Sequence, residues 1–295
     1  MAGPTLVRYL KGDISAPIAL LHLASEFEDS AALLGFLSDT AARLGAGEER
    51  AAARLATLRA FTESHRDGFA LVRSMGPPEA RAMAELPAKG IQAIRDLFDR
   101  LAEVDADTAA ALYTFGDPRI REAATAEVVA YLRERGVLSP MRRLLELGCG
   151  TGRLLEACAP LCGALTGLDV SPAMVARATA RLAPLANVEV RLGPGTDLRG
   201  FASHSVDVVL AADSWPYVVD LGADAVRRLG QEVARVLVPG GEFVVLNFSY
   251  REDESLDVAD VRELASELGF AVLEERGRPF TLWDGATWRL RRRER

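Results

Sequence analysis

The sequence predicts an α/β protein, with a seven-stranded, mostly parallel sheet that carries helices on both faces and an all-helical N-terminal subdomain. Apolar residues recur at helical spacing through residues 1–115, and no strand-like alternation interrupts them. From about residue 140, short apolar runs alternate with amphipathic segments, which is typical of strands joined by crossover helices. The first of these runs ends in a turn rich in glycine. We therefore expect two domains, at residues 1–115 and 116–295.

The N-terminal half is expected to be a series of helices. Residues 29–44 place Leu33, Leu34 and Leu37 on one face, with Asp29 or Ser30 as N-cap and Gly45 as the stop. A second stripe, which includes His65, runs to a break at Pro77 and Pro78. After Pro87 an amphipathic helix follows through residues 91–101. A long helix over residues 114–136 joins the halves, with Asp117 as N-cap and Pro118 at its first position.

The second half contains seven strand-like runs, separated by helical segments. These segments have apolar faces over residues 153–162, 171–183, 221–237 and 257–268. Such helices cover both faces of a parallel sheet. The last run follows the turn-rich FTLWDG, so we expect it to enter the sheet antiparallel as a hairpin partner. The runs lie at residues 142–149, 164–170, 187–193, 206–212, 241–249, 270–276 and 286–293.

Composition excludes several classes of protein. Of the 295 residues, 49% are hydrophobic, yet no apolar run reaches the roughly 18 residues of a membrane span, and we expect a cytoplasmic protein without membrane contact. The net charge of −7 argues against a protein that grips nucleic acid. The basic C-terminal run RLRRRER is short and is expected to be a solvated strand end. Three cysteines, an odd number with no ligand-like His nearby, predict buried thiols and no metal site.

The stretch ELGCGTG is the strongest candidate for a ligand-binding turn. Glu146 ends the strand, and Gly148, Gly150 and Gly152 form the turn into the next helix. Glycine is needed there because a side chain would keep the backbone from a ligand. A carboxylate beside a helix N-terminus would repel a pyrophosphate but favour a cationic ligand.

A second candidate is LDVSPAM, where Asp169 closes the next strand. A carboxylate at that position can accept hydrogen bonds from both hydroxyl groups of an adenosine ribose. Ser171 caps the following helix, and Met174 is expected near an adenine face. A third is the Pro-Gly-Gly turn in RVLVPGGEF, which precedes a buried strand.

With SVDVVLAADSW, these motifs occur in the order found in class I S-adenosylmethionine-dependent methyltransferases, which the chain resembles over residues 117–293. The resemblance implies a Rossmann-like fold and S-adenosylmethionine as cofactor, with S-adenosylhomocysteine as product. In that family the glycine loop receives the methionine part, and the fourth strand ends at the methyl group. Cys149 is then a backbone contact rather than a nucleophile. The implied cofactor residues are Glu146, Gly148, Cys149, Gly150, Gly152, Asp169, Val170, Met174, Gly195, Thr196, Asp197, Asp213, Ser214 and Trp215.

One motif departs from the family pattern. After the third strand, LGPGTDL places Pro194 where the family usually has an acid that bonds the adenine amino group. Proline offers no side-chain acceptor, so adenine would bond to Thr196, to Asp197 or to the Gly195 amide.

Substrate and catalytic residues are less defined. Aromatic faces suit a sulfonium, and Trp215 and Tyr217 follow the fourth strand directly, although Trp215 could equally pack under a surface loop. Tyr113 and Phe115 are further substrate candidates from the helical half. No general base is assigned; the weak candidates are His65 and Tyr217, and His65 is more readily explained as a core histidine.

The leading hypothesis is methyl transfer to an O, N or C atom of a small molecule such as a specialised metabolite. In DSWPY, Ser214 and Trp215 separate the acid from the proline, unlike the compact tetrad of nucleobase methyltransferases. Alternatives are a nucleic-acid or protein methyltransferase, or a cofactor-binding protein that no longer transfers methyl. The helical half would form the walls of the substrate pocket or, as the alternative, mediate formation of a homodimer.

Overall fold

The structure, a computed structural model, describes residues 3–76, 90–251 and 253–294. The break expected at Pro77 and Pro78, and Pro87, lie outside these residues. The chain divides into two compact units. A helical unit holds the described part of residues 1–80 together with residues 107–124 and 280–284, and a sheet unit holds the remainder. The predicted boundary at 115/116 remains a prediction about roles, since the chain passes between the units more than once.

The helical unit begins with five helices: α1 (Pro4–Lys11), α2 (Ala16–Glu26), α3 (Ser30–Ala42), α4 (Glu49–Ser64) and α5 (Arg66–Met75). Asp29 caps α3, because its carboxylate accepts the Ala32 N–H at 2.8 Å. The helix ends at Ala42, short of the predicted stop at Gly45. Leu33 and Leu37 are completely buried, which confirms the apolar stripe.

Two long helices connect the units. Helix α8 (Ile91–Ala109) has an extended residue inside it, Asp105, next to the point where the chain enters the helical unit. A short 3-10 turn, η1 (Leu112–Thr114), separates it from α9 (Pro118–Glu134). Asp117 accepts the Arg119 N–H at 2.8 Å. The predicted cap is therefore confirmed, whereas the helix is shorter than the predicted 114–136 because the 3-10 turn occupies its expected start.

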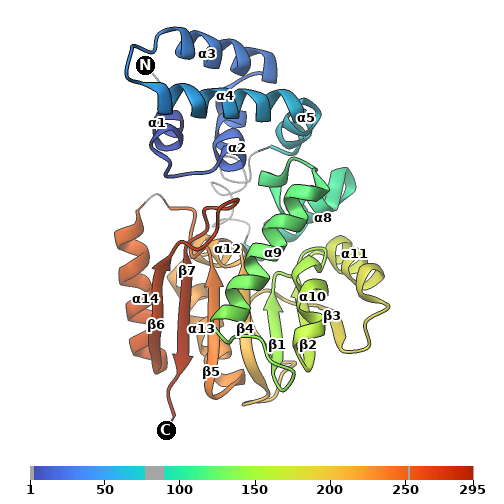
Figure 1. The fold of residues 1–295 in the computed structure, drawn as a ribbon. Helices are drawn as coiled ribbons and strands as arrows, with labels where there is room; N and C mark the ends of the chain where they lie inside the picture. Colours follow the sequence, from blue (N-terminus) through green and yellow to red (C-terminus); the bar gives the residue numbers. More distant parts are fainter. Residues whose placement is uncertain (1–2, 77–89, 252, 295) are drawn as a thin grey trace. The chain divides into compact units, whose positions relative to one another are not determined.

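The sheet unit contains the seven predicted strands. They are β1 (Arg143–Leu147), β2 (Ala164–Asp169), β3 (Val188–Leu192), β4 (Val206–Ala212), β5 (Leu237–Leu246), β6 (Phe270–Gly277) and β7 (Thr287–Arg292). Their order is β3-β2-β1-β4-β5-β7-β6. Strands β1 to β5 pair in parallel, and β7 lies antiparallel between β5 and β6, as predicted for the last strand (Figure 1).

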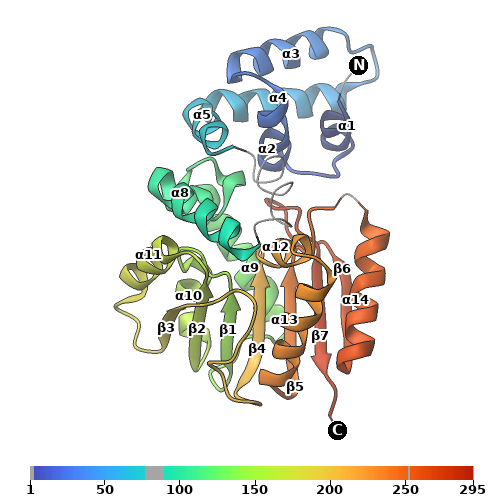
Figure 2. The same ribbon diagram turned by 180° about the vertical axis from the view of Figure 1, so that it is seen from behind.

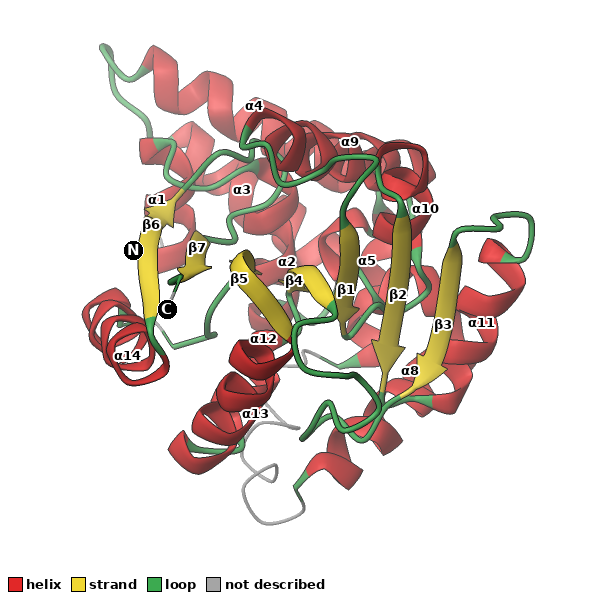
Figure 3. Ribbon diagram, turned by 90° about the horizontal axis from the view of Figure 1, so that it is seen from below, coloured by secondary structure: helices red, strands yellow, loops and turns green. Residues whose placement is uncertain are grey.

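Helices cover both faces of the sheet. Helices α9 and α10 (Arg153–Cys158) lie on one face, and α13 (Ala223–Val236) and α14 (Glu254–Leu268) lie on the other (Figures 2 and 3). The short turn η2 (Ala159–Leu161) follows α10, α11 (Pro172–Leu182) packs on β2 and β3, and α12 (Trp215–Asp220) packs on α13. Val209, Phe243 and Val245 lie in the core between the sheet and the helices. No helix among the described residues is long and apolar enough to cross a membrane.

The arginine-rich C-terminal run differs from its prediction. Arg289 is 8% exposed, and its guanidinium lies 2.8 Å from the carboxylate of Glu242, which is 1% exposed. Arg291 pairs with the same carboxylate at 2.9 Å. Both arginines lie on β7 beside β5, so the run joins two strands rather than forming a fully solvated end.

Candidate functional site

The predicted site residues of the sheet unit gather at the carboxyl ends of its parallel strands. The strand order reverses between β1 and β4, which is where open parallel sheets bind ligands. The glycine loop follows β1, Asp169 ends β2, and Asp213 follows β4. The strand before the loop runs one residue past Glu146, to Leu147.

The glycine loop has a backbone that only glycine adopts freely. Gly148, Gly150 and Gly152 have φ of +66°, +54° and +79°. A Cβ on Gly148 would lie 2.4 Å from Cβ of Ser214, and one on Gly152 would lie 2.7 Å from Leu182. The loop therefore needs glycine both for its conformation and for its contacts.

Asp169 holds the glycine loop and the following turn together. One carboxylate oxygen accepts the Gly150 N–H at 2.8 Å, and the other accepts the Ser171 N–H at 2.9 Å. Burial raises the pKa of Asp169, while these backbone donors oppose the rise. The adjacent Cys149 donates its N–H to the Leu168 carbonyl at 2.9 Å. Burial raises the pKa of the Cys149 thiol, which makes it a poor nucleophile.

Glu146 carries a buried polar atom that has no partner. Glu146 is only 3% exposed, and within the described part of the chain its Oε2 makes no hydrogen bond. Burial raises the pKa of Glu146 to about 8. A buried carboxylate without a donor is costly, and a cationic ligand would supply the missing partner. An open glycine turn beside this group fits the methionine part of S-adenosylmethionine, which carries an ammonium and a sulfonium.

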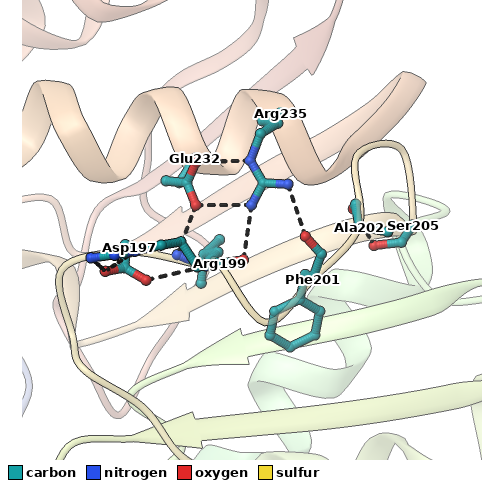
Figure 4. Close-up of polar contacts among 8 residues, drawn as sticks. Asp197, Arg199, Phe201, Ala202, Ser205, Glu232 and Arg235 are labelled. Atoms are coloured by element: carbon teal, nitrogen blue, oxygen red, sulfur yellow. Dashed lines mark hydrogen bonds and ion pairs between the residues drawn. The ribbon is translucent and has the colours of Figure 1, made fainter.

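The loop after β3 holds the three adenine candidates, of which Asp197 pairs with a neighbouring arginine. Gly195 has φ of +72°. Asp197 pairs with Arg199 at 2.8 Å, which lowers the pKa of Asp197 (Figure 4). Arg235 donates to the Phe201 carbonyl at 2.8 Å and fixes the loop (Figure 4). Thr196 and the Gly195 amide are thus the remaining adenine candidates with no such ion pair.

Helix α8 contributes contacts that the sequence did not indicate. Arg95 donates to the Val170 carbonyl at 2.8 Å. Asp99 accepts the Ser171 hydroxyl at 2.5 Å and the Ala173 N–H at 3.1 Å, and so adds a cap to α11. A Cβ on Gly195 would lie 2.6 Å from both Ile91 and Val170. The apolar face of α8 was visible in the sequence, but nothing there indicated which turn it would cover.

Two further residues that the sequence did not single out meet Asp213. Its Oδ1 accepts the Asn247 side-chain N–H at 2.8 Å and the Tyr250 hydroxyl at 3.1 Å. Tyr217 packs edge-on against Tyr250, with ring centroids 5.7 Å apart. On its other side Tyr217 packs against Phe98 of α8 at 5.4 Å. Asp213 and Tyr217 thus both contact Tyr250.

Trp215 and Met174 lie deeper than predicted. Each is 1% exposed. Trp215 belongs to the core and packs edge-on against Phe243 at 4.9 Å, and its indole N–H has no partner among the described residues. Met174 donates its backbone N–H to Ser171 and lies under the turn. In this structure both side chains therefore pack the fold, which corresponds to the alternative considered for Trp215.

The remaining candidates belong to the helical unit. His65 Nε2 lies 3.3 Å from an Asp117 carboxylate oxygen, and Nδ1 lies 2.8 Å from the Phe61 carbonyl. Tyr113 stacks on Trp283 with centroids 6.3 Å apart. Tyr113 and Phe115 are 4% and 3% exposed, so both pack within this unit.

Across residues 3–76, 90–251 and 253–294, no group of three or more His, Cys, Asp or Glu side chains could hold a metal ion. The three cysteines are buried and unpaired. Asn187 donates to the Cys162 carbonyl at 3.0 Å and to the Ala159 carbonyl at 2.8 Å, and so ties Cys162 to η2.

Comparison with known proteins supports the cofactor class. Residues 145–245 match the sequence model of a methyltransferase domain. The chain is 37% identical over 101 residues to the Homo sapiens thiol S-methyltransferase TMT1B, covering 33% of this chain and 39% of that protein. It is 32% identical over 157 residues to a demethylmenaquinone methyltransferase of Tropheryma whipplei strain Twist, covering 53% and 59%. The chain spans 36 to 47% of the length of three curated relatives.

A solved structure shares the fold. The Haloferax volcanii methyltransferase, solved in complex with a methyltransferase activator, superposes with a TM-score of 0.51 at 22% identity, covering 68% of this chain and 98% of that one. Together with the four ordered motifs, these matches show that the chain carries a class I, Rossmann-like methyltransferase domain. S-adenosylmethionine is the methyl donor of that class.

Proposed function

We propose that this protein transfers a methyl group from S-adenosylmethionine to an O, N or C atom of a small molecule. One observation carries the cofactor part: Asp169 accepts a hydrogen bond from the glycine loop that follows Glu146, whose buried Oε2 has no hydrogen-bond partner among the described residues. S-adenosylmethionine supplies an activated methyl group when bound. Placement of the reactants and exclusion of water are then the main tasks of the protein.

Each contact has a proposed role. Glu146 and the backbone of Gly148 and Gly150 bind the methionine part. Asp169 also binds the ribose hydroxyls, because a carboxylate has about four lone-pair sites and only part of them is needed for its backbone donors Gly150, Val170 and Ser171. The adenine ring is proposed to lie against Val170, Gly195 and the α8 residue Ile91. Because Pro194 replaces the acid that the family usually has here, backbone groups would hydrogen-bond to the base.

Three features favour a small acceptor. The named relatives act on a thiol and on demethylmenaquinone. The net charge of −7 disfavours binding to the phosphate backbone of a nucleic acid, which a basic groove would favour. Trp215 begins helix α12, so DSWPY is not the extended tetrad that grips a nucleobase. We place the activity in the cytoplasm and in specialised metabolism.

The helical unit is proposed to recognise the substrate. His65 and Phe115 lie close in this unit, with ring centroids 6.4 Å apart, and Tyr113 stacks on Trp283. Dimerisation is the alternative role. Light scattering of the full chain distinguishes them, because a dimer disrupted by helical-unit substitutions would assign that unit to assembly.

Calorimetry with S-adenosylhomocysteine tests the cofactor assignment. We expect binding by the wild type and a loss of about tenfold or more in Asp169→Ala, because a buried acceptor is removed. Wild-type protein that binds neither S-adenosylhomocysteine nor S-adenosylmethionine would refute the proposal. Product accumulation with panels of thiols, quinols, phenols and amines then separates transfer from cofactor binding alone.

A further inference from the structure

Two neighbouring strands end in residues that adopt an unfavourable backbone conformation. Asp213 follows β4 and Asn247 follows β5, and their φ values are +57° and +70°. Neither is glycine, so each is expected to cost about 1 kcal/mol. The two ends are held together, because the Asp213 N–H donates to the Leu246 carbonyl at 2.8 Å. Strain of this kind at strand ends points to a function for the side chains.

The left-handed conformations bring the two side chains together. Asn247 donates to Asp213 Oδ1 at 2.8 Å, and Tyr250 donates to the same oxygen at 3.1 Å. Burial and then the nearby Asp213 raise the pKa of Tyr250 well above its ordinary value. Tyr250 therefore stays a phenol and a donor. The two donors fix the orientation of the Asp213 carboxylate.

The turn that holds Asp213 lies beside the glycine loop. The next residue, Ser214, donates its hydroxyl to the Leu147 carbonyl at 2.5 Å, and its Cβ leaves no room for a side chain on Gly148. Apolar and aromatic side chains surround the turn: Ile94, Phe98 and Tyr217 pack as one cluster with Tyr250. A carboxylate in such surroundings interacts more strongly with a cation or an N–H donor than one in water.

We infer that Asp213 binds the methyl acceptor, which presents an N–H or O–H group to this carboxylate, with Asn247 and Tyr250 as positioning residues. The inference rests on the proposed function and names its acceptor class: amines and hydroxyl compounds rather than a substrate methylated on a bare aromatic carbon. Asp213 then has a role beyond the cofactor contact predicted for it.

A cofactor analogue tests the inference without knowledge of the substrate. In sinefungin an aminated carbon replaces the methylated sulfur, so an ammonium group lies where the transferable methyl would be. We expect the wild type to bind sinefungin more tightly than S-adenosylhomocysteine in calorimetry. Asp213→Asn should reduce this preference about tenfold, because a charge-assisted hydrogen bond becomes a neutral one. The two affinities are compared as a ratio within each variant, so that a change shared by both ligands cancels.

Further variants separate positioning from folding. Tyr250→Phe should lower the same preference about threefold, while its S-adenosylhomocysteine affinity is retained. Asp207→Asn is the matched control, because Asp207 lies at the other end of β4 and pairs with Arg143 at 2.8 Å. It should leave the preference unchanged.

Each outcome is decisive. An unchanged preference in Asp213→Asn overturns the inference. If that variant loses S-adenosylhomocysteine binding altogether, Tyr250→Phe decides: a reduced preference supports the inference and an unchanged one overturns it. A wild type that binds neither ligand instead refutes the proposed function.

Discussion

The glycine loop after β1 and the turns after β4 and β5 both adopt left-handed backbone conformations, but they do so with different residue types. Both require a left-handed backbone, at Gly148 and Gly150 in the loop and at Asp213 and Asn247 in the turns. The loop uses glycine because Ser214 leaves no space for a Cβ. The turns use residues with side chains, which meet in hydrogen bonds that offset part of the backbone cost. Glycine at position 148 thus permits a close approach of Ser214, whereas Asp213 and Asn247 keep side chains that we propose to act on the methyl acceptor.

The two regions also hold their carboxyl groups differently. Glu146, beside the loop, has an oxygen without a donor, whereas Asp213 in the turn accepts from two side chains on one oxygen. A carboxylate without donors in a buried place favours its protonated form. Glu146 therefore favours its protonated form until a cationic ligand is bound, whereas two donors already fix the orientation of the Asp213 carboxylate.

The largest expected effect is that of Gly148→Ala. The new Cβ would meet Ser214 at 2.4 Å in a backbone that disfavours alanine. We expect a destabilisation of about 2–4 kcal/mol in urea unfolding and loss of measurable S-adenosylhomocysteine binding. Gly200→Ala is the control, since a Cβ there would meet nothing within 4 Å. Normal binding by Gly148→Ala would show that the loop does not need its glycine for contact.

Next in size is the pH dependence caused by Glu146. Its pKa is raised to about 8 in the folded protein, from about 4.5 when unfolded, so the folded state favours the bound proton. This contribution is complete below about pH 4.5 and is lost as pH rises through about 8. Urea unfolding from pH 6 to 9 should show a decline in stability that Glu146→Gln removes. A decline that persists in this variant would assign the effect to another group.

The smallest expected effect on stability is that of Asn247→Gly. Glycine relieves a left-handed cost of about 1 kcal/mol but removes a hydrogen bond of similar size, so stability should change by less than about 1 kcal/mol. The preference for sinefungin should nevertheless fall, because Asp213 loses one of its donors. If glycine left that preference intact, the side chain of Asn247 would have no positioning role, and the contrast between the two regions would be weaker.

Most of the sheet unit could be predicted from local patterns. The seven strands, the antiparallel entry of the last one and the Asp117 cap all follow from periodicity and turn chemistry. Boundaries were less accurate: α9 begins at Pro118 because a 3-10 turn precedes it. For Trp215, its place directly after a strand predicted a pocket residue, but its side chain packs in the core.

The sequence by itself determined the glycine loop, Asp169 at the end of β2 and the order of the motifs, because backbone conformation and hydrophobic period are local properties of the chain. Only the tertiary structure decided which side chains meet there. Arg95 and the Val170 carbonyl are 75 positions apart, and Asp213 and Tyr250 are 37 apart. No local pattern encodes such meetings, since they depend on where the helices and strands pack.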